Sequence, residues 1–403
     1  MITIELQRPS SHRYALTHLG FRPFFLLAGG FAVVSMVLWL ALYSFAWQGL
    51  PAQYPRQTWH AHEMIFGYLL AVVAGFLLTA VKNWTGQQTL HQTPLMTLAA
   101  VWLLARLLPF TGLPLIYTAA ADLSFQLILS LALMQPIIRA RQWQQFAIIG
   151  KLLFMLIANS LFYLGLLGIW PVGSTLGLYM AFYLFIALTL TMARRVMPFF
   201  IEKGVGVAFT ARNYRWLDYA SLGLFLSFML AELSYIASGY APLATLVSTL
   251  ALLQIPLHIL RLAGWYHPAI WRKPLLWVLY AAYGWLILGF ALKGLSIWLA
   301  LSPWLAVHAF AYGGLSLMTV GMMARVILGH TGRNVFAPPP ALNPLFALIM
   351  LGAVVRVFCV ALWPQAHTVW IVLAQVLWIA AFSLFLWIYA PMLIKARVDG
   401  RYG

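Results

Sequence analysis

The sequence predicts an all-α membrane protein, a polytopic bundle of about twelve transmembrane helices. Of its 403 residues, 64% are hydrophobic and only 8% are charged, which is outside the range of soluble domains. Apolar runs of about 20 residues, long enough to cross a hydrocarbon core of about 30 Å, recur along the whole chain. No hydrophilic stretch between them is long enough to fold separately. We therefore expect residues 1–403 to form a single transmembrane domain.

The apolar runs place each expected span along the chain. In order they are approximately 24–46, 60–82, 93–110, 113–135, 146–170, 174–193, 216–238, 241–262, 274–294, 304–328, 341–363 and 367–394. The first run is too long for the core of a signal peptide and follows a polar start, so no cleavable signal is expected. Three successive prolines at 338–340 end the tenth span and set up the eleventh.

The distribution of lysine and arginine predicts the orientation. Basic residues in short loops mark the cytoplasmic side of a membrane protein. With the N-terminus inside, 20 of the 24 basic residues fall on the cytoplasmic half, Arg8 and Arg13 among them. The exceptions are Arg56, Arg106, Lys293 and Arg356. Both termini are therefore expected in the cytoplasm, and the net charge of +17 needs no nucleic-acid partner.

Two interruptions organise the chain without dividing it into domains. The wider one, 194–215, is expected to be a cytoplasmic loop with five basic residues, between six helices in 1–193 and six in 216–394. The other, 329–344, holds the three prolines.

A direct internal match relates the second and tenth spans at a constant shift of 246 residues. It places His62 on His308, Gly67 on Gly313, Leu69 on Leu315, Gly75 on Gly321 and Thr85-Gly86 on Thr331-Gly332. The two spans run parallel, since they are an even number of helices apart. We interpret them as two versions of one functional element; the alternative is a chance match between glycine-containing membrane helices.

The outer end of the second span carries the first candidate site. Each ionisable group inside a bilayer costs about 2.5–3.5 kcal/mol on insertion scales, so each marks a possible site. His60, His62 and Glu63 open the second span, and His308 opens the tenth on the same side. On a helix His60 and Met64 share a face, whereas His62 lies about 200° from His60. We expect His62 to face His308, and His60 to serve a neighbouring site with Met64 or Glu63.

The chemistry of these side chains suggests a metal or haem. Cys359 is the only cysteine, which excludes disulfides, iron–sulfur clusters, c-type haem and two-cysteine copper centres. Imidazole suits haem iron, copper and zinc, and methionine adds a preference for copper. The alternative is a set of interfacial histidines bonded to backbone or water. Glu63 is the candidate catalytic group as a proton donor; otherwise it orients a histidine or acts as a charge at a helix N-terminus.

The inner end carries a second, less specific cluster. Arg325 precedes the end of its span by a full turn, where it could pair with a carboxylate such as a haem propionate. Arg195 and His330 lie where cytoplasmic positive charges are expected in any case. The 22 residues from His308 to His330 cover about 33 Å of helix, so one metal cannot contact both.

The remaining ionisable groups inside the spans are ambiguous. Arg106 and Arg356 have no obvious acidic partner in the sequence and either reach propionates on the outer side or extend to the interface. His258 follows a proline and is either a second axial ligand or a helix-capping histidine. Asp122 and Glu232 would suit proton-coupled transport.

Several motifs resemble the NnrS family. They are LGFRPFFLLAG (19–29), WHAHEMIFGY (59–68), AGFLLTAVKNWTG (74–86), RRVMPFF (194–200), HAFAYGG (308–314) and MMARVILGHTGR (322–333), about a third of the chain. In the ninth span, where relatives are expected to have a histidine, this sequence has Tyr280 and Tyr283. That departure puts a ligand role for this span in doubt.

The resemblance implies a bacterial inner-membrane protein of nitric oxide metabolism and denitrification that contains haem and copper. The motif positions fall on His60, His62, Glu63, Arg195, His308, Arg325 and His330. Our leading hypothesis is a haem b protein in which His62 and His308 bind the iron, with copper held by His60 and Met64 or another histidine. It would bind nitric oxide and detoxify or reduce it, with electrons from quinol or a partner protein.

Two other functions stay open at this stage. Twelve helices divided by a basic cytoplasmic loop are also typical of secondary transporters. A third possibility is an assembly factor that handles haem or copper without turnover. Whether the protein is an enzyme, for example an oxidoreductase like a nitric oxide reductase, is not decided by the sequence.

Overall fold

The chain folds into long helices that pack side by side. The computed structural model describes residues 14–403, and within them twelve helical spans are long and apolar enough to cross a membrane. The predicted all-α transmembrane fold is therefore confirmed. The basic residues Arg8 and Arg13, predicted on the cytoplasmic side, lie outside the described residues.

The first six spans are built from α1 to α7. Their bounds are α1 (Phe21–Ser44), α2 (Arg56–His62) with η1 (Glu63–Leu69) and α3 (Leu70–Thr85), α4 (Gln92–Leu107) with η2 (Leu108–Phe110), α5 (Leu115–Arg139), η3 (Trp143–Gln145) with α6 (Phe146–Leu166), and α7 (Gly173–Gly204). Each of these spans crosses the bundle in the direction opposite to the one before it.

The last six spans are built from α8 to α15. Their bounds are α8 (Arg215–Ser238), α9 (Ala241–Gly264), α10 (Pro274–Leu295), α11 (Pro303–His308) with η5 (Ala309–Ser316) and α12 (Leu317–His330), α13 (Leu342–Val354) with η6 (Val355–Cys359) and α14 (Val360–Leu362), and η7 (Pro364–Ala366) with α15 (His367–Ile394). The short η4 (Pro268–Arg272) lies between α9 and α10.

One predicted boundary is wrong. The loop expected at 194–215 is shorter, because α7 continues through Pro198 to Gly204. The basic residues mark where the hydrocarbon region ends, and a helix can continue beyond that point when its face stays packed. Here a Cβ added at Gly204 would lie only 2.9 Å from Leu276, so the last turn of α7 packs closely on α10.

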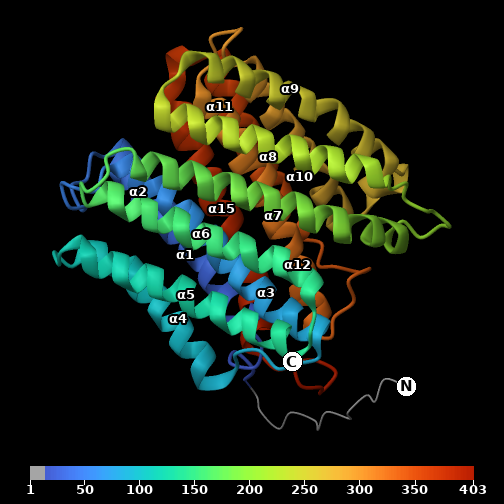
Figure 1. Cartoon of the computed structure of the whole chain (residues 1–403). Coiled ribbons are helices and arrows are strands. Elements are labelled where there is room, and N and C mark those ends of the chain that lie inside the picture. Colours follow the sequence, from blue (N-terminus) through green and yellow to red (C-terminus); the bar gives the residue numbers. More distant parts are fainter. Residues whose placement is uncertain (1–13) are drawn as a thin grey trace.

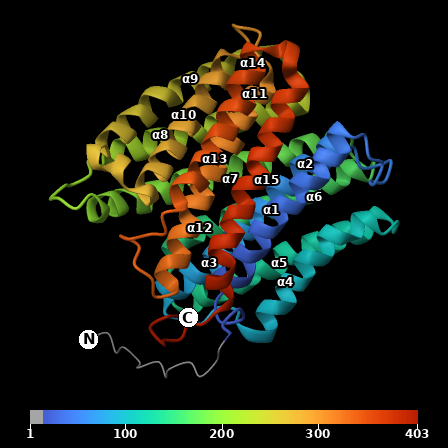
Figure 2. The ribbon, with the colours of Figure 1, turned by 180° about the vertical axis from the view of Figure 1, so that it is seen from behind.

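The spans that carry the matched sequence lie in the centre of the bundle. Arg56–Thr85 and Pro303–His330 have buried shares of 83% and 72%, against 33% for α8 and 28% for α9. In Figures 1 and 2, α8 and α9 form one edge of the molecule, α4 and α5 form the opposite edge, and α1, α3, α7 and α15 lie between them. The ionisable groups on the matched spans are therefore placed among helices rather than against lipid.

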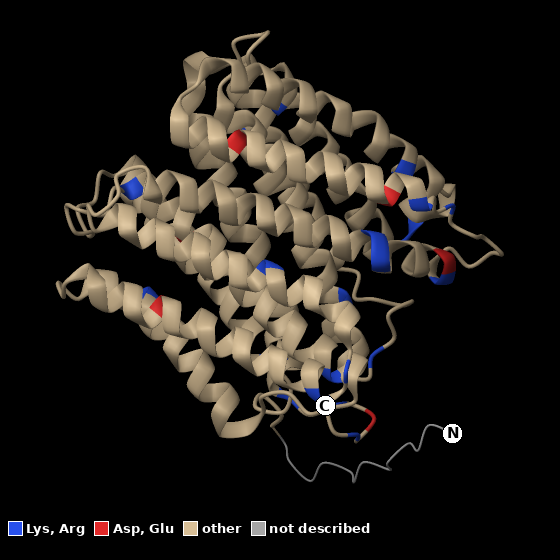
Figure 3. Ribbon diagram, in the orientation of Figure 1, with Lys and Arg blue, Asp and Glu red and all other residues tan. Residues whose placement is uncertain are grey.

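The charges gather on one side. Figure 3 shows most lysine and arginine residues at the helix ends on the side of the C label. Tyr14 and Lys395 form an isolated β-bridge, so both ends of the described chain lie on this side. We call it the inner rim and the opposite ends of the helices the outer rim. Two chain ends on the same side require an even number of membrane crossings, which agrees with the twelve spans.

The internal match is also visible in the backbone. A π-helix follows His62 at Glu63–Leu69, and another follows His308 at Ala309–Ser316, so the shift of 246 relates their starting residues. The two spans that contain these π-helices are each followed by a glycine with positive φ, 67° at Gly86 and 78° at Gly332. A residue with a side chain would be strained at either position. Isolated π-turns occur often at functional sites. The shared backbone supports our interpretation of two versions of one element.

Candidate functional site

His60 lies on α2 at the outer rim and is stacked on an indole. Its ring is 4.5 Å from the Trp39 ring of α1, centroid to centroid, with an angle of 9° between the planes. The stacking fixes the orientation of the imidazole. Its Nδ1 atom is buried and has no hydrogen-bond partner among the described residues. Buried polar atoms are rarely left unsatisfied, so this nitrogen is available to a group that the protein binds.

His308 ends α11 on the same rim and has one ring nitrogen fixed. Its Nδ1 is 2.8 Å from the carbonyl oxygen of Trp304, one turn earlier in the helix. A carbonyl only accepts, so Nδ1 carries the hydrogen and Nε2 carries the lone pair. Histidines that bind a metal through Nε2 commonly donate the Nδ1 hydrogen to a carbonyl in this way.

Arg356 brings a positive charge to these histidines. It lies in the π-helix η6, which packs against α11, is half-buried, and lies within electrostatic range of both His60 and His308. None of the carboxylates in residues 14–403 pairs with it. We call His60, His308 and Arg356 the outer triad. Figures 1 and 2 place two of its helices, α2 and α11, at the same end of the bundle, opposite the C label.

His62 lies elsewhere, which corrects the expectation that it faces His308. Its ring is stacked on Phe162 of α6, 4.3 Å between centroids. Nδ1 is 3.0 Å from Glu63 Oε1, and Nε2 is 3.3 Å from Asp122 Oδ2 and 3.1 Å from Asn159 Oδ1. Both nitrogens are therefore engaged. A buried carboxylate without a hydrogen-bond donor is costly, and the His62 ring supplies a donor to both Glu63 and Asp122. These two carboxylates therefore orient the ring toward themselves and away from His308.

Arg106 completes this buried cluster, and the expectation that it reaches a propionate or extends to the interface is wrong. Its guanidinium bonds Glu63 Oε2 at 2.8 Å and Asp122 Oδ1, so it bridges the two carboxylates. Arg106 is only 3% exposed and Asp122 is fully buried. Charge-assisted hydrogen bonds of this kind are roughly twice as strong as those between neutral groups.

Neutral side chains satisfy the remaining oxygen atoms of Asp122. The Asn159 amide donates to Asp122 Oδ2 at 3.0 Å and to Gln126 Oε1 at 3.2 Å, and the Tyr163 hydroxyl donates to Asp122 Oδ2 at 3.2 Å. We call His62, Glu63, Arg106, Asp122 and Asn159 the buried network. Two carboxylates and one guanidinium leave one negative charge, and both ring nitrogens of His62 face acceptor oxygens, as those of a protonated imidazole do. Glu63 is thus an ion-pair partner, and any catalytic role for it stays a prediction.

The inner cluster is held by aromatic rings rather than carboxylates. Arg195 lies over the Trp84 ring at 4.4 Å and donates to Gln145 Oε1 at 2.9 Å. Arg325 lies over the Phe200 ring at 3.8 Å. In the described part of the chain no ion pair involves either arginine. Cation–π contacts hold an arginine in place without neutralising it. Both therefore stay available to an anion.

His330 is part of the same inner region. Its ring is 5.6 Å from that of Phe21, and it interacts electrostatically with Arg22, Lys82 and Arg397. It lies at the inner end of α12, whereas His308 lies near the outer end of the same span. The predicted separation of two clusters along this span is therefore what the structure shows.

Comparison with known proteins can now be set beside this geometry. The sequence model of the family described as NnrS protein matches residues 15–397. The chain belongs to the NnrS family. No curated protein matches the sequence. The match covers all twelve spans, so both the outer triad and the buried network belong to the part of the chain that defines membership of the NnrS family.

His258 does not join the outer triad. It lies seventeen residues from the outer end of α9, whereas His308 lies five residues from the outer end of α11, so the two differ in depth by about 18 Å. Its Nδ1 is 2.7 Å from the Tyr283 hydroxyl. Within this NnrS chain, His258 and the outer histidines therefore cannot bind one metal together.

Copper has less support than haem. In residues 14–403 no group of three or more histidine, cysteine, aspartate or glutamate side chains is placed to hold a metal ion. Met64 is half-buried in η1, and the π-turn there changes the regular spacing to His60 on which the prediction depended.

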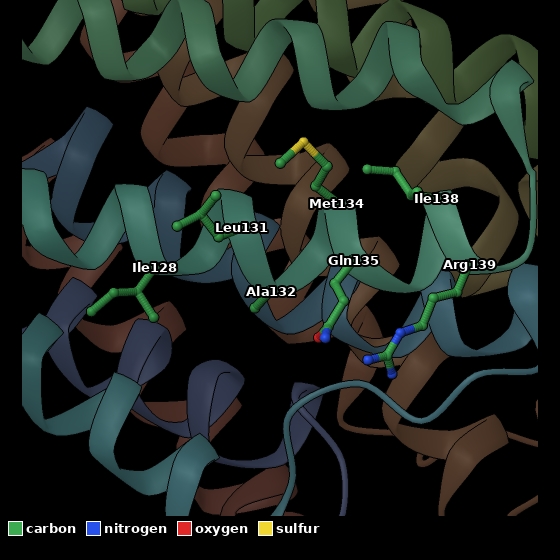
Figure 4. Close-up of a pocket in the computed structure, with 7 residues that line it drawn as sticks. All are labelled: Ile128, Leu131, Ala132, Met134, Gln135, Ile138 and Arg139. Atoms are coloured by element: carbon green, nitrogen blue, oxygen red, sulfur yellow. The ribbon is translucent and has the colours of Figure 1, made fainter.

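A pocket elsewhere contributes nothing to these sites. It is lined by Ile128, Leu131, Ala132, Met134, Gln135, Ile138 and Arg139, all from α5 (Figure 4). Most of these side chains are exposed on the side of α5 that faces away from the bundle, as expected for a surface against lipid.

The sequence did not identify the partners of the buried network, although one signal was present. Arg106 and Asp122 lie on consecutive antiparallel helices on either side of the turn at 108–114. Arg106 lies two residues before this turn and Asp122 eight residues after it, a difference in depth of about 9 Å that a long arginine side chain can largely span. A buried arginine and a buried aspartate in that relation are expected to pair.

Proposed function

We propose that this chain is a multi-pass protein of the bacterial inner membrane that binds haem b at the outer triad and binds nitric oxide there, detoxifying or reducing it. The observation that carries the proposal is the juxtaposition of His60, His308 and Arg356. It supplies two imidazoles and one uncompensated positive charge, and haem b has an iron that binds imidazole and two propionates that bind arginine.

The residues fit the group. Nδ1 of His60 has no other partner, and Nε2 of His308 carries a lone pair, so each can bind iron. Arg356 would hold a propionate. Haem iron supplies a site for a diatomic ligand and for one-electron chemistry. The stack on Trp39 and the bond to the Trp304 carbonyl hold both rings in place before binding, which lowers the entropic cost of binding.

Two parts of the proposal extend the family resemblance. Copper would be held by two side chains. The candidates are Met64 and one histidine of the outer rim. Nitric oxide is small and apolar, so it can reach the half-buried His308 through the bilayer. Electrons would come from quinol or a partner protein.

Replacing either histidine of the outer triad is expected to remove haem. His60→Ala and His308→Ala should each lose most of the reduced-minus-oxidised haem signal per purified protein, since one imidazole of the pair is missing. His62→Ala should keep most of that signal, because His62 belongs to the buried network. The measurement is the optical spectrum with the haem content of the pure protein.

The matched control is His367→Ala, an exposed histidine at the start of α15 on the same rim. It should retain the wild-type spectrum. A full haem signal in both His60→Ala and His308→Ala would contradict the assignment. Loss of haem in His62→Ala alone would indicate that His62 binds the iron.

Replacing Arg356 is expected to change the affinity of the protein for haem and to leave the ligands of the iron unchanged. Arg356→Gln should weaken haem binding by roughly 10- to 100-fold, as outer-shell changes at metal sites do. The absorption maxima should be unchanged, because the iron ligands are intact. Titration of haem-free protein with hemin measures the affinity. Wild-type affinity in Arg356→Gln would show that this arginine does not hold a propionate.

The same spectra separate this function from transport. A colourless protein that binds neither haem nor nitric oxide, and that accumulates a solute in vesicles, would favour the transporter. Turnover of nitric oxide with an electron donor would distinguish an enzyme from an assembly factor that only holds haem.

A further inference from the structure

The four helices α7 to α10 contain buried polar atoms that the proposed haem site does not use. These helices lie next to one another in Figure 1, and α7 with α8, α8 with α9, and α9 with α10 are in contact. Three of their side chains carry such atoms and are at most 2% exposed: Glu232, Gln254 and His258. Together they carry four atoms without a hydrogen-bond partner among the described residues. We call these helices the α7–α10 unit.

The first of these side chains lies near the outer rim. Glu232 on α8 accepts from Lys293 Nζ of α10 at 2.5 Å and from the Tyr183 hydroxyl of α7 at 3.4 Å, both at Oε1. Its Oε2 has no partner. Tyr179 interacts with the same carboxylate electrostatically. The carboxylate therefore has one oxygen in an ion pair and one buried oxygen without a partner.

The second lies in the middle of the unit. Gln254 on α9 has an exposed fraction of 0%, and neither its Nε2 nor its Oε1 has a partner. A buried amide without hydrogen bonds is unfavourable, because it has lost its bonds to water without replacing them. Its amide is four residues from His258, so both side chains lie on one face of α9.

The third lies toward the inner rim. His258 is stacked on Phe290 and bonds the Tyr283 hydroxyl through Nδ1 at 2.7 Å, while its Nε2 has no partner. Arg261 donates to the same hydroxyl at 3.4 Å and to Asp218 at 3.0 Å. Asp218 also pairs with Arg194 at the inner rim.

These groups are spaced across the bilayer. Counting residues from the outer end of each helix places Glu232 at a depth of about 9 Å, Tyr183 at about 15 Å, Gln254 at about 20 Å and His258 at about 26 Å. In depth alone, no step exceeds about 6 Å, the length that one bridging water covers with two hydrogen bonds. We call these four side chains with Tyr283 the polar row.

We propose that the polar row encloses internal water molecules and conducts protons across the α7–α10 unit, between Glu232 near the outer rim and His258 near the inner rim. Water fits because each unpartnered atom needs a small partner that both donates and accepts, and buried water usually makes about three such bonds. Carboxylate, phenol and imidazole all exchange protons, and such chains mark proton relays in membrane proteins.

The transfer requires no other reactant. A proton entering at one end forms an O–H or N–H bond with the first acceptor, and that group releases its own proton to the next. After the last release the row regains its hydrogens by rotation of its hydroxyls and waters. No oxidant or reductant takes part, so the proposal does not depend on haem, on nitric oxide or on the outer triad.

Proton flux into vesicles tests the proposal. The full-length protein is reconstituted in vesicles of three parts phosphatidylethanolamine to one part phosphatidylglycerol, with a pH-sensitive dye inside, and a potassium gradient with valinomycin makes the interior negative. Wild-type protein should acidify the interior faster than protein-free vesicles. Gln254→Leu should lose this flux, because leucine interrupts the row at its centre.

The matched control is Gln375→Leu on α15. Gln375 is 4% exposed and also has both amide atoms unpartnered, but it lies outside the α7–α10 unit. It should keep the wild-type flux. Glu232→Gln, which changes shape least, is the second variant and should lose the flux even where Gln254→Leu does not fold.

The contrary outcomes are equally clear. Wild-type vesicles no leakier to protons than protein-free ones would overturn the proposal, as would wild-type flux in a folded Gln254→Leu or in Glu232→Gln. A high-resolution map without density between Gln254 and His258 would overturn the hydration on which it depends. Since none of these measurements uses haem or nitric oxide, failure here leaves the proposed function untouched.

Discussion

Arg106→Met is expected to destabilise the folded protein by about 3–5 kcal/mol, the range found when one partner of a buried ion pair is removed. Arg106 bonds Glu63 and Asp122 inside the bundle, and all three side chains are at most 3% exposed. Without the guanidinium, two carboxylates remain in a low-dielectric region with His62 as their only partner able to carry charge. Because methionine fills most of the same volume, the loss comes from the charge rather than from a cavity.

The measurement for Arg106→Met is the temperature at which the detergent-solubilised protein loses its monodisperse size-exclusion peak. Arg139→Met, an exposed arginine at the inner end of the neighbouring α5, is the matched control and should keep the wild-type temperature. An unchanged transition in Arg106→Met would mean that water or lipid headgroups reach the carboxylates.

A charge-balanced variant isolates the cause. Arg106→Met combined with Glu63→Gln removes one charge of each sign and leaves Asp122 paired with His62, so it should recover a large part of the stability lost in the single variant. Failure to recover would assign the effect to the shape of the guanidinium and its directional hydrogen bonds.

The spans could be read from the sequence because the bilayer leaves few alternatives. A run of apolar residues must form a helix, since no water is available for its backbone polar groups. The predicted 216–238 and 274–294 correspond to Arg215–Ser238 and Pro274–Leu295 in the structure. The extension of α7 to Gly204 was missed, because hydropathy marks the hydrocarbon boundary and not the packing that continues the helix beyond it.

The candidate site was only partly readable. Helical geometry predicted that His60 and His62 cannot point at one ligand, and the structure places them in different environments. The direction in which each points depends on other helices. His62 is oriented by Asp122 and Asn159, which are distant from it in sequence. His60 is oriented by its stacking on Trp39. The π-helices were equally hidden, because such turns depend on tertiary packing.

Gly177→Leu is expected to cause the second large loss, by forcing α6 and α7 apart. A Cβ at Gly177 would overlap the carbonyl oxygen of Ala158 and lie 2.6 Å from the backbone nitrogen of Phe162. Backbone atoms of a helix cannot rotate away as a side chain can. Overpacking of a core costs about 1–3 kcal/mol and occasionally more. This value should be exceeded here, because a whole helix has to move.

The displacement would also reach the buried network. α6 carries Asn159, which bonds His62 and Asp122, so a shift of α6 stretches those contacts as well. Gly223→Leu on α8 is the matched control: this glycine is exposed, has ordinary helical φ, and a Cβ there meets nothing within 4 Å. Thermal unfolding of the two variants should differ sharply, with Gly223→Leu close to wild type. If Gly177→Leu unfolds at the wild-type temperature, α6 and α7 are not in rigid contact and the buried network tolerates movement of its α6 side.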